Sequence, residues 1–167
     1  NVEMSNGITS INGSVFYDCD SLNSVIIPDS VTSIGWYAFE YCDNLSSVKL
    51  SKKLTYLGYE AFDNCTSLTS IEIPVSLNET GGRCFSNCSA LNNITFEKGI
   101  TKITDGLFEG CTGVKSITIP DTVTVIEEGA FSNCDNLTSV SIGKGLTSID
   151  LGLFYKCKNL QNITIGD

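Results

Sequence analysis

The sequence predicts an α/β-type repeat solenoid, in which the chain winds into 23-residue coils around one continuous core. A Phe recurs at every 23rd position from Phe16 to Phe154, with no insertion or deletion. Each Phe is followed three residues later by a Cys, and three residues after that by a Leu or, once, a Val. A fixed period of about 20–50 residues is the signature of a solenoid whose coils touch only their neighbours. We therefore predict a single array over residues 1–167, with about seven repeats.

A short strand is predicted in every coil from two apolar residues that follow the Phe by nine and eleven positions. Val25 and Ile27 are the first full example, and polar residues precede the pair. Alternation with period two and β-branched side chains is typical of a half-buried strand. Val2 and Met4 occupy the same columns of the repeat, so we expect eight strands in one parallel sheet.

The rest of each coil is predicted to hold a second extended piece and a helical turn. Residues such as 31–34, eight to five positions before the Phe, read as a shorter extended segment. Apolar residues at spacings of three, such as Phe39, Cys42 and Leu45, suit one or two turns of α- or 3₁₀-helix. Prolines fall in every other coil, which adds a second period of 46 residues; they are Pro28, Pro74 and Pro120.

Composition excludes several classes of function. Nineteen acidic and ten basic residues give a net charge of −9. This argues against nucleic acid and anionic membrane surfaces, whose binding depends on clustered Lys and Arg. No apolar run approaches the 18 residues of a membrane span, so we expect no membrane insertion. The absence of His removes Ser-His-Asp and Cys-His catalysis and every His-bearing zinc site. We predict no enzyme activity and no cofactor.

The cysteines are predicted to be packing residues of the core. Seven of the eight share one column of the repeat. Strands stack about 4.8 Å apart with parallel side chains. The Cβ atoms of stacked cysteines are therefore farther apart than the Cβ–Cβ separation of roughly 3.8 Å that is typical of a disulfide. Buried free thiols are therefore favoured over disulfides. Cys84 stands where other coils have Ala, as at Ala38, and reads as a small core residue. Cys84 and Cys88 would need two further ligands to hold a metal, and none is evident.

Two groups of residues are candidates for ligand binding. The first lies on the outward face of the sheet, ten positions after the Phe, and comprises Lys49, Glu72, Thr95 and Thr118. The second gathers most of the aromatic rings outside the Phe column, namely Trp36, Tyr37, Tyr41, Tyr56 and Tyr59. Exposed Trp and Tyr suit protein interfaces and sugar platforms. The alternative is that they shield the coil edge, with Trp36 and Tyr59 stacked on adjacent coils. No row of the sheet pairs a nucleophile with a base.

Acidic residues in the later coils raise the question of calcium. Asp105 and Glu128 share one column, and the next column holds Thr104, Glu127 and Asp150. Ca²⁺ takes six to eight oxygen ligands, which such a group could begin to supply. The array lacks the loop spacing of known calcium motifs, so a solvated acidic face is favoured and no metal site is predicted.

The repeat motif is similar to that of a known family. Residues 27–42, with Ile27-Pro28, Val31-Thr32, Ile34-Gly35, Ala38-Phe39 and Cys42 in register, resemble the BspA-like, or Treponema pallidum type, leucine-rich repeats, and the resemblance covers the whole chain. It implies a right-handed superhelix with the parallel sheet on its concave face. It also implies an extracellular or cell-surface protein in adhesion or protein binding. Departures are Thr80 in an apolar column and the loss of Gly four positions before Phe16, Phe108, Phe131 and Phe154.

The function predicted is a non-enzymatic surface or secreted module that mediates protein–protein or host-cell adhesion. The alternatives are a structural spacer that presents other domains, and a glycan-binding repeat domain. The expected partner is a protein, from a host or a second copy, with a glycan as the alternative. Neither end carries the polar cap that a solenoid needs for solubility. We therefore expect a fragment of a longer protein, or end-to-end self-association through the terminal strands.

Overall fold

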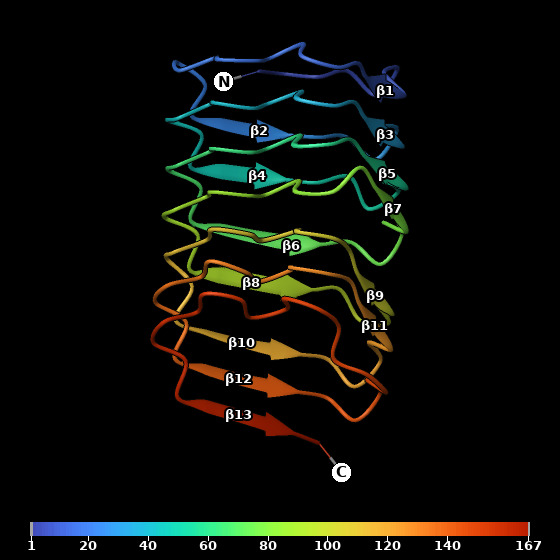
Figure 1. Cartoon of the computed structure of the whole chain (residues 1–167). Coiled ribbons are helices and arrows are strands. Elements are labelled where there is room, and N and C mark those ends of the chain that lie inside the picture. The colour runs from blue at the N-terminus through green and yellow to red at the C-terminus, as the bar shows by residue number, and fades with distance from the viewer. Residues whose placement is uncertain (1, 167) are drawn as a thin grey trace.

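Each coil contributes one strand to a main parallel sheet in the computed structural model, which describes residues 2–166 (Figure 1). Strand partners are 23 residues apart, as in Ser24 opposite Ser47. This confirms the predicted solenoid of 23-residue coils. Within the described residues the sheet has seven strands, and Val2 forms only an isolated bridge to Val25 where an eighth was expected. The strands are β2 (Ser24–Ile26), β4 (Ser47–Lys49), β6 (Ser70–Ile73), β8 (Asn93–Phe96), β10 (Ser116–Ile119), β12 (Ser139–Ile142) and β13 (Asn162–Ile165).

The second extended segment forms two-residue strands in six of the coils, as predicted, on another side of the stack (Figure 1), whereas residues 146–149 of the last coil form none. One ladder joins β1 (Ser10–Ile11), β3 (Ser33–Ile34), β5 (Tyr56–Leu57) and β7 (Glu79–Thr80), and another joins β9 (Lys102–Ile103) to β11 (Val125–Ile126). No pairing joins β7 to β9 among residues 2–166. Thr80, which departs from the apolar pattern, ends β7, and Gly82 then turns the backbone at φ +91°.

The predicted helical turn around each Phe is wrong, since residues 2–166 contain no helix. The residues two before and two after the Phe take the left-handed conformation, as at Tyr37 (φ 56°) and Tyr41 (φ 58°). Their amides point to the next coil. Tyr37 donates to Tyr59 O at 2.9 Å and Tyr41 donates to Asp63 O at 3.0 Å. Backbone hydrogen bonds between coils therefore replace the hydrogen bonds that would run along a helix. Residues 2–166 accordingly hold no helix of the length and apolarity that a membrane span requires.

The core is a ladder of aromatic rings lined by thiols. Phe39 and Phe62 stack with centroids 4.8 Å apart and planes within 2°, and similar contacts run from Phe16 to Phe154. All eight cysteines are free thiols, as favoured from the sequence. The column cysteines donate to the Phe carbonyl one coil earlier, as in Cys65 Sγ to Phe39 O at 3.2 Å. Cys84 is buried, as predicted, and its Sγ donates to Gly58 O at 3.3 Å.

The main sheet is divided along its length. Strand β2 pairs with β4, β6 pairs with β8, and β12 pairs with both β10 and β13. Within the described residues no ladder joins β4 to β6 or β8 to β10. The divisions recur every second coil, at the 46-residue period of the prolines.

Candidate binding site on the main sheet

The predicted outward column of the sheet lies on its exposed face. Strand β6 shows why, because its residues alternate between exposed and buried from Ser70 to Ile73. Successive side chains of a strand point to opposite faces, so the residue between two core positions faces solvent. This places one exposed side chain on each of four consecutive strands, Lys49 on β4, Glu72 on β6, Thr95 on β8 and Thr118 on β10.

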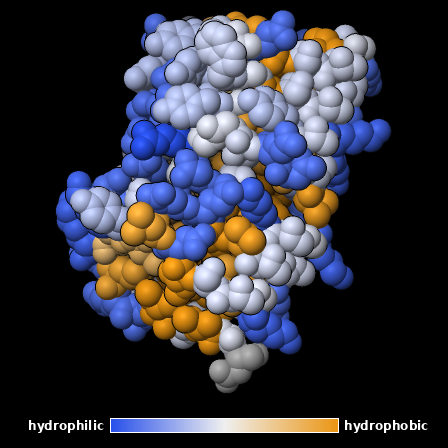
Figure 2. Space-filling view, turned by 45° about the vertical axis from the view of Figure 1, so that its right-hand side comes forward, coloured by the Kyte–Doolittle hydropathy of each residue, from blue (hydrophilic) through white to orange (hydrophobic). Residues whose placement is uncertain are grey.

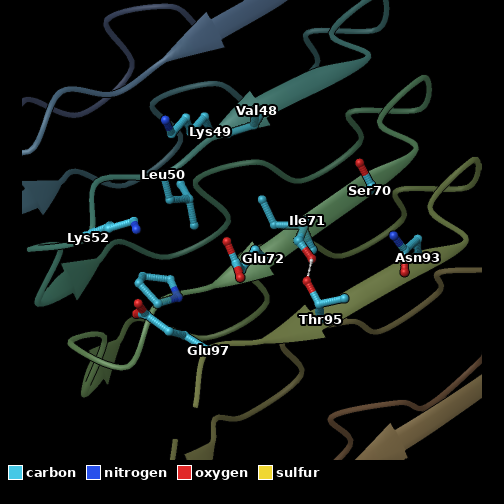
Figure 3. A pocket seen from close by; sticks show the side chains of 11 residues that line it. Val48, Lys49, Leu50, Lys52, Ser70, Ile71, Glu72, Asn93, Thr95 and Glu97 are labelled. Atoms are coloured by element: carbon cyan, nitrogen blue, oxygen red, sulfur yellow. Dashed lines mark hydrogen bonds between the residues drawn. The ribbon is translucent and has the colours of Figure 1, made fainter. Parts of the chain in front are cut away.

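A hollow of about 290 Å³ opens on this face between β4, β6 and β8 (Figure 3). The structure brings together three of the predicted residues in its lining, Lys49, Glu72 and Thr95. Apolar groups of Val48, Leu50, Ile71 and Pro74 also line it. Thr118 lies apart, in a neighbouring hollow of about 430 Å³ that it shares with Pro120 and Ser141.

Two charged residues of this hollow, Lys52 and Glu97, were not among the residues singled out from the sequence. The repeat held a signal for Glu97, which stands in the same column as Pro28 and Pro74, twelve positions after the Phe. Alternation along the strands would place that whole column on the outward face, together with the column of Glu72. The structure corrects this, because Ser51 and Pro74 in the column are buried. Glu97 is half-buried, and its Oε2 accepts a 2.9 Å hydrogen bond from the amide of Val75.

Most charged side chains of the hollow form no ion pair. The three ion pairs of residues 2–166 are Arg83–Glu109, Lys102–Glu127 and Lys158–Asp135, and none involves Lys49, Lys52 or Glu72. The Thr95 hydroxyl donates weakly to Ile71 O at 3.4 Å (Figure 3). Charges of both signs therefore surround a partly apolar floor, and a partner can pair with them without first breaking an ion pair.

The aromatic group lies elsewhere and lines none of these hollows. Tyr37 links Trp36 to Tyr59, with its ring centroid 5.4 Å from the first and 5.7 Å from the second, both edge to face. Trp36 is 56% exposed, and its indole covers Gly13 so closely that a Cβ there would lie 2.8 Å from Cε2. Tyr41 instead meets Tyr17, with centroids 5.8 Å apart. Tyr56 is exposed on β5.

The later acids form an exposed face, as the sequence favoured. Asp105, Glu128 and Asp150 are exposed, and Glu127 pairs with Lys102 at 2.7 Å. Asp105 and Glu128 do line a hollow of about 440 Å³ with the Arg83–Glu109 pair. Among residues 2–166 the only trio of acids with oxygens close enough to share a metal is Glu40, Glu60 and Asp63, which sequence reasoning did not single out.

Apolar side chains gather over the last coils of the described chain. Figure 2 shows a hydrophobic area over the lower part of the face that it presents, below a polar upper part. Ile149 and Leu151 in these coils are 52% and 76% exposed. Leu151 also lines the hollow of Asp105 and Glu128, together with Tyr155.

Comparisons with known proteins agree with this architecture. A family model described as the BspA type leucine rich repeat region matches residues 1–115 and 83–167, in six copies. The chain is 30% identical to a leucine-rich repeat protein of Treponema pallidum of known structure, with a TM-score of 0.64, over 94% of this chain and 63% of that one. It is 27% identical to a leucine rich cell surface protein of Faecalibacterium prausnitzii A2-165, with a TM-score of 0.68, over 98% of this chain and 52% of that one.

A leucine-rich repeat protein of Eubacterium ventriosum shares the fold at 23% identity, with a TM-score of 0.64, over 84% of this chain and 41% of that one. The chain thus spans less than two thirds of the length of these three solved structures. No curated protein matches the sequence. No enzyme family is indicated, and this repeat fold is typically a non-enzymatic scaffold. The chain belongs to the BspA-type leucine-rich repeat family.

Proposed function

We propose that the protein is an extracellular or cell-surface module that binds another protein through the exposed face of its main sheet. Leucine-rich repeats are generally protein-interaction modules, and solenoids bind on extended surfaces. The right-handed, curved course that the family resemblance implies would put this face on the concave side. Adhesion to a host cell is the form of binding that the family resemblance favours.

One observation carries the choice of face, the hollow between β4, β6 and β8. Protein interfaces combine apolar contact at their centre with polar groups at the rim. The floor of Ile71 and Pro74, with Lys49, Lys52 and Glu72 around it and free of ion pairs, has this composition. Complementary charges on a partner would fix its orientation and speed its association.

The surface location rests on similarity to one protein. The matched Faecalibacterium prausnitzii chain is described as a leucine rich cell surface protein. Immunolabelling of intact cells that produce the protein tests this location. Labelling that requires permeabilised cells would refute it.

The binding proposal is tested by screening the folded chain against arrays of extracellular host proteins. Any partner is then measured by surface plasmon resonance with Lys49→Glu and Glu72→Lys. We expect each reversal to weaken binding at least tenfold, because like charges then oppose across the interface. The matched control is Lys115→Glu, which reverses an exposed charge outside the hollow and should leave the affinity unchanged.

Two outcomes separate the alternatives. A structural spacer predicts no binder for the folded chain. A binder whose affinity is insensitive to both reversals would reject this face. End-to-end association of copies stays a prediction, and concentration-dependent sedimentation of the purified chain tests it.

A glycan site is the second candidate, favoured by the exposed indole of Trp36 beside Tyr37 and Tyr59. Amphipathic aromatic rings suit both apolar contact and polar partners. A glycan array compares the wild type with Tyr59→Ala, which spares the Trp36–Gly13 packing. Glycan binding that Tyr59→Ala abolishes would support this site, and an array without any signal would reject it.

A further inference from the structure

Three carboxylates converge on the edge of the stack, away from the main sheet. Glu40 follows Phe39 in one coil, and Glu60 and Asp63 flank Phe62 in the next. One oxygen of each lies within 4.8 Å of an oxygen of the other two. Glu60 takes the left-handed conformation at φ 52°, two positions before the Phe. The repeat alone would assign these acids to two separate columns.

Glu40 differs from the other acids of its column because its carboxylate has no partner. Asp63 and Glu109 each follow their Phe as Glu40 does, and each accepts from an Asn one coil later. Asn87 donates to Asp63 Oδ1 at 3.1 Å, and Asn133 donates to Glu109 Oε1 at 3.1 Å. The equivalent amide for Glu40 is Asn64, which turns to Asp63 Oδ2 at 2.6 Å instead.

Because Glu40 is largely buried, the lack of a partner raises the energy of its charged form. Only 7% of its surface is exposed, and no hydrogen bond or ion pair within residues 2–166 involves its side chain. The charges that act on Glu40 are those of Asp63 and Glu60, both negative. Burial first, and then these two charges, raise the pKa of Glu40 to about 7. A largely buried carboxylate that faces two like charges and has no protein partner is stabilised when a proton or another cation lies beside it.

The oxygens of this site suit a hard cation. Carboxylates without nitrogen or sulfur ligands favour Ca²⁺, Mg²⁺ or Mn²⁺ over softer metals. Ca²⁺ holds oxygens at about 2.3–2.6 Å, so two of its ligands can lie about 5 Å apart, whereas Mg²⁺ demands a tighter octahedron at about 2.0–2.1 Å. The oxygens of the three acids lie no more than 4.8 Å apart, a separation that the coordination shell of Ca²⁺ spans.

We propose that Glu40, Glu60 and Asp63 form a Ca²⁺ site that joins two adjacent coils, with water completing the coordination. Asp63 is held for this role by its Asn64 and Asn87 hydrogen bonds, and Glu40 supplies the uncommitted carboxylate. The site is independent of the binding face on the main sheet. With three protein carboxylates and several waters, we expect a dissociation constant of about 10⁻⁴–10⁻³ M, the range of extracellular calcium modules.

Isothermal titration of CaCl₂ into the full chain at pH 8 tests the site, with Glu40→Gln as the variant. We expect one Ca²⁺ per wild-type chain and at least tenfold weaker binding for Glu40→Gln. Glu109→Gln is the matched control, because it removes a charge from the same column where Asn133 already satisfies the carboxylate, and it should bind as the wild type does. Binding should weaken below pH 7, because protons then compete for Glu40.

A thermal melt in 10 mM CaCl₂ and in 10 mM MgCl₂ gives a second readout. Stabilisation by a ligand follows its concentration relative to its dissociation constant, so Ca²⁺ should raise Tm of the wild type and not of Glu40→Gln. The isosteric variant also relieves charge repulsion, so it should melt no lower than the wild type without calcium. Equal Ca²⁺ binding by Glu40→Gln and the wild type, or no binding at 10 mM, would overturn the site, and equal stabilisation by Mg²⁺ would overturn the choice of ion.

Discussion

The amide of Gly143 donates a 2.9 Å hydrogen bond to the carbonyl of Ile119, one coil earlier, and this bond continues the ladder from β10 to β12. Glu97 makes the same bond to Ile73, from β8 to β6. The residue in this position is Pro in the alternate coils, as at Pro74 and Pro120. Proline has no N–H to donate. Both divisions of the main sheet fall where a Pro stands in this position, so one missing donor accounts for the 46-residue period.

Replacing Pro120 should close one of these divisions. Pro120→Ala supplies an amide at the position equivalent to Gly143, and we expect it to bond to the Phe96 carbonyl. Hydrogen exchange measured by NMR should then show the Ala amide protected to a degree similar to that of Gly143. The free energy of unfolding should change by less than about 1 kcal/mol, since a new hydrogen bond offsets the lost rigidity of Pro in the unfolded chain. Free exchange of the Ala amide would contradict this account.

Removing one ring of the Phe ladder should strongly destabilise the fold. Phe108 is fully buried, 5.9 Å from the Phe85 centroid and 5.6 Å from that of Phe131. Phe108→Ala should lower the free energy of unfolding by about 3–5 kcal/mol, because it opens a cavity in the core. Urea denaturation measures this, with the exposed Thr118→Ala as a control that should stay within about 0.5 kcal/mol. A loss below about 1 kcal/mol would be incompatible with a rigid ring ladder.

Gly58 should not tolerate a side chain. A Cβ there would meet the Trp36 amide nitrogen and the Gly35 carbonyl carbon of the preceding coil, well inside van der Waals contact. Gly58→Ala should therefore destabilise the protein by about 1–3 kcal/mol through a backbone shift between coils. Gly7→Ala is the matched control, because its Cβ would come no nearer than 3.9 Å to Ser5 Oγ. Equal midpoints in urea for the two variants would show that coil spacing adjusts freely.

The fully buried thiols should be unreactive in the folded protein. Burial raises the pKa of Cys84 and of Cys134 to about 12, so almost no thiolate is present at pH 8. We expect Ellman's reagent to label only the half-buried Cys19 and Cys157 in the native chain, and all eight cysteines after unfolding in urea. Fewer than eight thiols in the unfolded, unreduced chain would reveal disulfides.

Glu40 should make stability depend on pH in the absence of calcium. Its pKa rises from 4.5 to about 7 on folding, chiefly through burial. Between these values the folded chain holds a proton that the unfolded chain has lost, so this group's contribution to stability falls as the pH rises through that window. Thermal melts from pH 4.5 to pH 8 in EDTA should show a shallower decline for Glu40→Gln than for the wild type. Parallel curves would show that Glu40 does not titrate in this window.

The sequence by itself determined the winding of this protein and the faces of its strands. An invariant spacing of 23 residues leaves one register for the coils, and alternation at Ser70–Ile73 leaves one face for Glu72. The exposed column of Lys49, Glu72 and Thr95 followed from that alternation, and the hollow that they line required only that neighbouring strands stack.

The tertiary structure decided the path around each Phe and the carboxylate site. Spacing of apolar residues favours a helix there, but amides such as that of Tyr37 find their acceptors on the next coil, which only the stacked array supplies. Glu40 and Glu60 come together with Glu60 in the left-handed conformation. Glu40 lacks a hydrogen-bond partner because the Asn64 side-chain amide donates to Asp63 instead. A left-handed Glu60 is locally unfavourable, so contacts between coils, rather than a local preference of Glu60, bring the acids together.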